Sequence, residues 1–159
     1  MTQQIDIKKD RLRYTKNSET ATQAYVAIVF NVLYFVSIYN KDVGNFYYTN
    51  TIGFSVISNL LFLLAAFLCS EGVKNYKLSY SIAFIPLGIF QIIRIFGIPY
   101  NAYNTILKLD GSIVRVMEPT QLIFTSIFLL CSAAACFATA IGGIIKTRTL
   151  RDYEKSISN

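Results

Sequence analysis

Four long runs of predominantly apolar residues divide the sequence, at 21–39, 51–69, 78–98 and 120–145. Each run is close to or above the roughly 20 residues that a helix needs to cross a hydrocarbon core of about 30 Å. Inside a bilayer the backbone polar groups must bond within their own segment, which favours helices. We therefore predict an all-α membrane protein, a four-helix transmembrane bundle that forms a single domain over 1–159.

The segments outside these runs are short and polar. They comprise the tails 1–20 and 146–159 and three connections, none of them long enough for a separate folded domain. The hydrophobic share of 53% exceeds the roughly 45–50% of ordinary soluble domains. The first run is too long for the core of a signal peptide and lacks a small-residue cleavage site, so we interpret it as an anchor.

The connection between the third and fourth runs contains a hairpin signal. Asp110-Gly111 is a favoured two-residue hairpin turn, and the short segments 105–109 and 112–116 flank it. Pairing across the turn would place apolar side chains on one face and basic ones on the other. The apolar face would hold Leu107, Leu109, Val114 and Val116, and the basic face Lys108 and Arg115. A lone hairpin is marginal in water, so we expect the apolar face to lie on the bundle, the headgroup region or a partner.

Basic residues are distributed unequally between the two sides of the predicted bundle. Of the 15 Lys and Arg residues, eleven fall in the two tails and the second connection, and three in the other two connections. By the positive-inside rule both termini are cytoplasmic and the hairpin lies outside. We expect the plasma membrane of a prokaryote. The net charge of +6 is then a topology signal, and no polar region is large enough to bind nucleic acid.

The third run carries polar groups that a lipid-facing helix would lack. Gln91 and Arg94 are three residues apart and share one helix face, and Pro86 and Gly88 predict a kink. Arg94 is about four residues, roughly 6 Å, from the end of the run. Two interpretations stay open: an interfacial arginine that reaches lipid phosphate, and a buried arginine that binds a ligand or partner. Gln91 favours a face directed towards protein.

Single polar residues in the other runs complete the candidate set. Asn31 lies in the first run and Asn59 in the second, and each is expected to bond to a neighbouring helix, with direct ligand binding as the alternative. Glu118 adjoins the start of the fourth run, where we expect it to pair with Arg94. The predicted binding residues are Asn31, Asn59, Gln91, Arg94 and Glu118.

The fourth run contains a regular pattern of small residues. Ala134, Ala138 and Gly142 recur every four residues, which is typical of a seam where two helix backbones approach closely. We expect this seam to pack inside the bundle, with packing against a second copy as the alternative.

The residue types exclude several kinds of chemistry. Histidine is absent, and Cys69, Cys131 and Cys136 form no C-x-x-C pair, so we read them as buried small hydrophobic residues. All nine carboxylates lie outside the runs or at their ends, which argues against a proton-coupled exporter. No nucleotide-binding, hydrolase or metalloprotease motif is present. We therefore predict a protein that is not an enzyme, with no cofactor and no metal site.

Two functional hypotheses follow from these features. The leading one is a non-catalytic structural or regulatory subunit of a membrane complex, with the lipid bilayer and a protein partner or a second copy as its contacts. The alternative is a transporter or solute-binding component with an outward-facing polar pocket around Asn31, Asn59, Gln91 and Arg94. Convergence of these four side chains on one pocket would favour the alternative.

Overall fold

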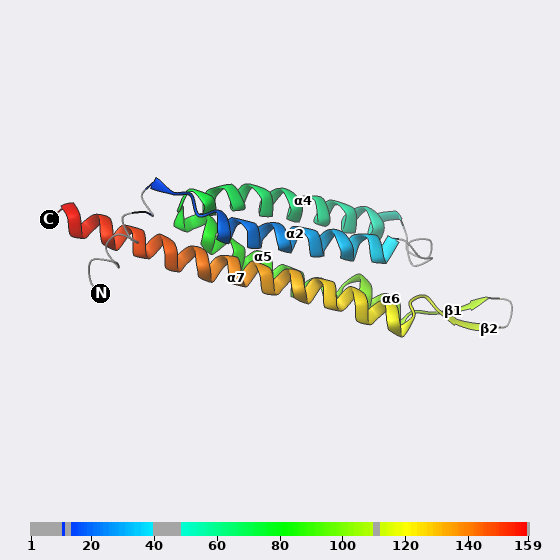
Figure 1. Ribbon diagram of the computed structural model, residues 1–159. Helices are drawn as coiled ribbons and strands as arrows, with labels where there is room; N and C mark the ends of the chain where they lie inside the picture. Colours follow the sequence, from blue (N-terminus) through cyan, green and yellow to red (C-terminus); the bar gives the residue numbers. More distant parts are fainter. Residues whose placement is uncertain (1–10, 12–13, 40–48, 110–111, 159) are drawn as a thin grey trace.

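The computed structural model describes residues 11, 14–39, 49–109 and 112–158. Four long helices run side by side along one axis: α2 (Ser18–Tyr39), α4 (Thr49–Lys74), α5 (Leu78–Phe96) and α7 (Pro119–Ser158). A short helix, α6 (Ile98–Asn104), follows α5, and two strands, β1 (Ile106–Leu109) and β2 (Ser112–Arg115), project from that end of the bundle (Figure 1).

Four of the described helical segments are long and apolar enough to cross a membrane, which confirms the predicted number. Their boundaries differ from the apolar runs. α7 has 40 residues, about 60 Å, because the polar segment after residue 145 continues the same helix. α5 and α6 together form the third candidate span, Leu78–Asn104. The third span is therefore longer than the run 78–98.

A local break separates α5 from α6. The Gly97 N–H donates to the Arg94 carbonyl at 3.1 Å, a tighter bond than the helical pattern, and ends α5. Pro99 then lies in the first turn of α6. The N–H groups of a first turn have no acceptor within the helix, so the N–H that proline lacks costs no helical hydrogen bond. Pro99 thus begins a second helix in the same direction instead of starting an irregular connection.

The two strands pair antiparallel, with Leu107 opposite Val114 and Ile106 opposite Arg115. The turn Asp110-Gly111 and the side chains of 107–114 lie outside the described residues, so the predicted apolar face stays a prediction. The base of the pair is buried in the bundle. Val116 and Met117 join a core cluster with Tyr34 on α2 and Leu129 on α7.

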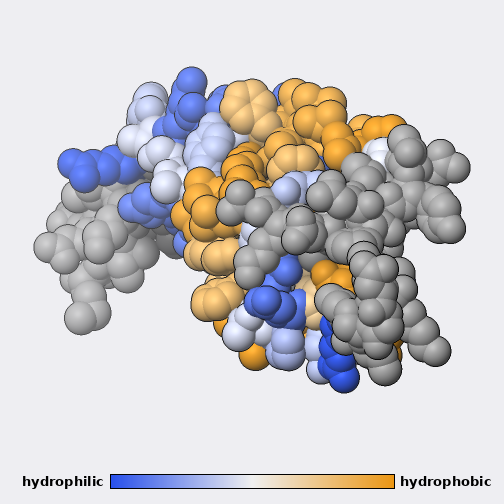
Figure 2. All heavy atoms as spheres, turned by 90° about the vertical axis from the view of Figure 1, so that its right-hand side faces the viewer, coloured by the Kyte–Doolittle hydropathy of each residue, from blue (hydrophilic) through white to orange (hydrophobic). Residues whose placement is uncertain are grey.

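The helices form a closed arrangement in which α2 and α5 each contact both α4 and α7. Small side chains, such as Ala24, Ala27 and Ala140, fill much of the core around Phe62 and Phe84. Large apolar side chains instead point outward along all four helices, as expected where lipid covers the surface. Figure 2, a view onto the hairpin end, shows hydrophobic side chains at the surface of the bundle.

The start of α2, the end of α4 and the polar part of α7 meet at the end of the bundle opposite the hairpin (Figure 1). The Asn17 N–H donates to the Lys74 carbonyl at 3.0 Å. Lys146 forms an ion pair with Glu19 at 2.7 Å. These contacts hold α2, α4 and α7 together at that end.

The small-residue seam of α7 differs from the predicted one. Ala134 and Ala138 are exposed, so the expectation that this face packs inside the bundle is wrong for these two residues, and Gly142 is half-buried beside Thr20. The physical reason is where the stripe lies round the helix: Ala134 and Ala138 are each two residues, about 200°, from the buried Ser132 and Cys136, so they face away from the bundle. The buried seam includes Ser132, Cys136, Ala140 and Gly143.

Candidate functional site

Polar side chains from all four long helices meet inside the bundle. Asn31 comes from α2, Asn59 from α4, Gln91 and Arg94 from α5, and Ser132 from α7. Asn31, Gln91 and Ser132 are completely buried, and Asn59 is 3% exposed. We call these five residues the polar cluster. The structure therefore brings together four of the five predicted binding residues.

Arg94 is the centre of the polar cluster. Its Nη1 donates to Asn31 Oδ1 at 2.6 Å and to Gln91 Oε1 at 3.0 Å, and its Nη2 donates to Asn59 Oδ1 at 2.6 Å. The guanidinium carbon lies 4.6 Å from the centre of the Tyr34 ring. Arg94 thus bridges α5 to α2 and α4, and its charge is directed into the bundle, not towards lipid phosphate.

Gln91 extends the polar cluster to α7. Its Nε2 donates to Asn31 Oδ1 at 3.0 Å and to Ser132 Oγ at 3.2 Å. The Ser132 hydroxyl in turn donates to the Ala27 carbonyl of α2 at 2.8 Å. Sequence reasoning missed Ser132 because it stands among other small residues. The one feature of the sequence that could have identified Ser132 is its hydroxyl group in an apolar run. Such a hydroxyl needs a hydrogen-bond acceptor within the protein, because lipid offers none.

The polar cluster lies well inside the spans. Asn31 is eight residues, about 12 Å, before the end of α2, and Asn59 is ten residues, about 15 Å, after the start of α4. Arg94 is ten residues, also about 15 Å, from the end of α6. The depth of Arg94 was underestimated from sequence because α6 continues the third span beyond the run.

Glu118 does not belong to the polar cluster. It precedes α7, where its carboxylate accepts a bond from Thr120 Oγ1 at 3.4 Å. Ser132, the cluster residue of α7, is about 21 Å further along that helix. The expected pair with Arg94 is therefore wrong. Arg94 forms no ion pair with any described residue. The ion pairs Lys74–Glu71 and Lys146–Glu19 lie at the opposite end of the bundle.

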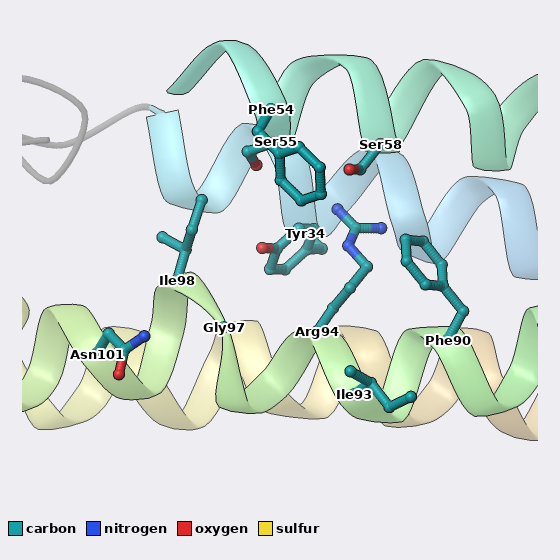
Figure 3. Close-up of a pocket in the computed structure, with 10 residues that line it drawn as sticks. All are labelled: Tyr34, Phe54, Ser55, Ser58, Phe90, Ile93, Arg94, Gly97, Ile98 and Asn101. Atoms are coloured by element: carbon teal, nitrogen blue, oxygen red, sulfur yellow. The ribbon is translucent and has the colours of Figure 1, made fainter. Parts of the chain in front are cut away.

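A cavity of about 380 Å³ lies beside Arg94, between α4 on one side and α5 with α6 on the other. Figure 3 shows the Arg94 side chain extending from α5 towards α4, with Tyr34 of α2 beside the guanidinium. Among the described residues that line the cavity, Arg94 is the only charged one. They are Tyr34, Phe54, Ser55, Ser58, Phe90, Ile93, Arg94, Gly97, Ile98 and Asn101.

The two asparagines leave donors without partners. Because their Oδ1 atoms accept from Arg94, the orientation of each amide is determined. The Nδ2 atoms of Asn31 and Asn59 are buried and have no hydrogen-bond partner among the described residues. Both asparagines also line a second cavity of about 70 Å³ between α2 and α4. The polar cluster thus offers more donors than acceptors.

This arrangement is suited to binding a group that accepts hydrogen bonds or carries negative charge. A guanidinium cannot lose its proton in a protein, so Arg94 cannot act as a general base. Within the described residues, no group of three or more acidic, cysteine or histidine residues is placed to hold a metal ion.

Comparison with known proteins finds no match to this chain among protein-family models, curated proteins or solved structures.

Proposed function

We propose that this protein is a non-catalytic solute-binding or transport component of a membrane, with the polar cluster as the anchor for its ligand. The observation that carries the proposal is the convergence of Asn31, Asn59, Gln91 and Arg94 beside a cavity of about 380 Å³. A charged side chain held rigidly at membrane depth is costly, and such residues mark ligand or ion pathways by default. The cavity volume falls in the range of about 300–1,000 Å³ typical of small-molecule sites.

In the proposed topology both termini are cytoplasmic and the cavity end of the bundle faces outward, in the plasma membrane of a prokaryote. The support is the excess of Lys and Arg in the tails and in the α4–α5 connection. A reporter that fluoresces only in the cytoplasm is expected to be active when fused after Asn159 and silent when inserted at Asp110. The reverse pattern would overturn the assignment.

Access to the cavity is expected from the outer side. In a variant in which Cys69, Cys131 and Cys136 are replaced by alanine, Ser58→Cys should react with a membrane-impermeant maleimide added to intact cells. An opening of the cavity to the outer solution would bring water to the thiol, and the reactive thiolate forms in contact with water. The measurement is the fraction of labelled protein after purification.

The matched control is Ile57→Cys in the same background. Ile57 is adjacent to Ser58 but is 57% exposed on the apolar surface, where lipid suppresses the thiolate. We expect it to label at least tenfold more slowly. Equal and slow labelling at both positions would show that the cavity is closed to solute and would contradict the proposed function.

A second candidate is the structural or regulatory subunit. The observation that favours it is the exposure of Ala134 and Ala138 on the outer face of α7, because small side chains allow another helix to approach closely. Purification in mild detergent distinguishes the candidates. Other chains retained in a fixed ratio, and lost with Ala138→Leu, would support the subunit over the solute-binding component.

A further inference from the structure

The charge on Arg94 has no counterion in the spans. The sequence places no Asp or Glu between residues 20 and 39, between 49 and 70, between 78 and 109, or between 119 and 151. Among the described residues, the partners of the guanidinium include three amide oxygens and the rings of Tyr34 and Phe90, all neutral. Arg94 is half-buried, and charges that are taken out of water are normally paired, because desolvating an ion costs several kcal/mol.

Arg94 also has N–H donors that no described residue is recorded as accepting. A guanidinium carries five N–H groups, and three bonds to described residues are formed, through Nη1 and Nη2. The side chain lines the cavity between α4 and α5, and Ser55 and Ser58 add hydroxyl groups on the facing helix. This side of the cavity therefore offers hydrogen-bond donors and a positive charge.

The other walls of the cavity are apolar. Phe54, Phe90, Ile93 and Ile98 line it. Phe54 is 74% exposed and Ile93 is 60% exposed, on α4 and α5 respectively. These two side chains stand on either side of the cavity and belong to the lipid-covered surface. The cavity is therefore bordered by the bilayer, and an apolar chain is the natural complement to its walls.

We propose that the cavity binds a single-chain anionic amphiphile, with its oxyanion head on Arg94 and its apolar chain between α4 and α5. The inference rests on the proposed function and specifies its ligand class. The carboxylate or phosphate head supplies a negative charge, which the described surroundings of Arg94 lack, and further acceptors for its remaining N–H groups; a planar guanidinium suits both kinds of head. The chain covers Phe90 and Ile93 and continues towards the lipid.

The test measures thermal unfolding of the full chain in non-ionic detergent. Cys136 is buried and Cys69 and Cys131 are half-buried, so their reaction with a fluorogenic thiol dye should rise on unfolding and report the transition. Dodecanoate and dodecyl phosphate, at about 100 times their Kd, are expected to raise the midpoint by about 5–10 °C. Dodecanol, which has the same chain and no charge, should raise it by less than about 2 °C.

Two variants distinguish binding in the cavity from a general stabilisation of a basic protein by anionic micelles. Arg94→Gln removes the charge, and Ser58→Phe fills the cavity while leaving the contacts of Arg94 in place. Both should lose the difference between dodecanoate and dodecanol, and Ser58→Phe keeps the test valid if Arg94→Gln does not fold. Arg148→Gln, a loss of positive charge on the polar part of α7, should retain the difference.

Each contrary result overturns a defined part of the inference. Equal shifts with dodecanol and dodecanoate would eliminate the role of the charge. A shift of the same size with inorganic phosphate alone would show that the site takes a free oxyanion, not an amphiphile. Labelling of Ser58→Cys combined with no shift for any of these probes would contradict the ligand class and leave the proposed function standing.

Discussion

Arg94→Lys is expected to lower the unfolding midpoint in detergent by about 5–15 °C, corresponding to a loss of about 2–4 kcal/mol. The guanidinium reaches Asn31 from Nη1 and Asn59 from Nη2, both at 2.6 Å, and so joins three helices through a planar fork. An ammonium group is a single point with a different reach and cannot keep both short bonds. Arg148→Lys, at an exposed position on α7, should change the midpoint by less than about 2 °C.

A double-mutant cycle assigns the loss to a particular contact. Asn59→Leu alone leaves Nη2 of Arg94 without its acceptor, whereas Asn59→Leu with Arg94→Met replaces both partners by apolar groups. The double variant should therefore lose less stability than the sum of the single variants, by about 1–3 kcal/mol. Glu118→Ala should combine additively with Arg94→Met, because Glu118 is bonded to Thr120 at the start of α7. An Arg94→Lys variant as stable as the parent would mean that Arg94 reaches lipid phosphate instead.

Gly143→Leu is expected to have the other large effect. A Cβ atom at Gly143 would meet the Oγ of Ser81 and lie 2.9 Å from its Cβ, and Ser81 is fully buried on α5. The added side chain must push α5 and α7 apart, and overpacking of this kind costs about 1–3 kcal/mol. We expect the unfolding midpoint to fall by about 3–10 °C in the same thiol-reactive assay.

Ala138→Leu is the matched control on the same helix. Ala138 is exposed, so a larger apolar side chain enters lipid or detergent and the midpoint should change by less than about 2 °C. Gly53→Ala offers a second control, because a Cβ there meets nothing within 4 Å. Replacing a glycine inside a helix by alanine should increase the free energy of unfolding by about 0.5–1 kcal/mol. A fall in the midpoint for Ala138→Leu equal to that for Gly143→Leu would contradict the position of the seam.

The small-residue seam illustrates the limit of reading a helix by spacing alone. The sequence pattern identified α7 as the helix with the small side chains, and the structure confirms that small residues line its buried face. The choice of Ala134 and Ala138 was wrong because a four-residue spacing does not show which side of the helix faces the bundle. Ser132, Cys136 and Ala140 have the same spacing on the other side, and only the positions of α2 and α5 decide which stripe is covered. That information is absent from the local pattern.

The polar cluster was partly predictable for a general physical reason. An amide or a guanidinium in an apolar run has no water to bond, so Asn31, Asn59, Gln91 and Arg94 each had to find a protein partner. Their mutual pairing was not predictable, because it depends on how far each helix is rotated and on the relative heights of the four spans. The choice of Glu118 was wrong because Glu118 precedes α7 and is 14 residues, about 21 Å along the helix axis, from Ser132 of the polar cluster.

The sequence by itself determined that four helices are long and apolar enough to cross a membrane, because hydrophobicity and length are properties of each segment alone. Only the tertiary structure decided where Arg94 lies in depth, which amide oxygens it bonds, and that a cavity lies beside it. The physical reason is that α6 continues the third span beyond the break at Gly97, so Arg94 lies further from the end of the bundle than the apolar run indicates. At that position its guanidinium contacts Asn31, Asn59 and Tyr34.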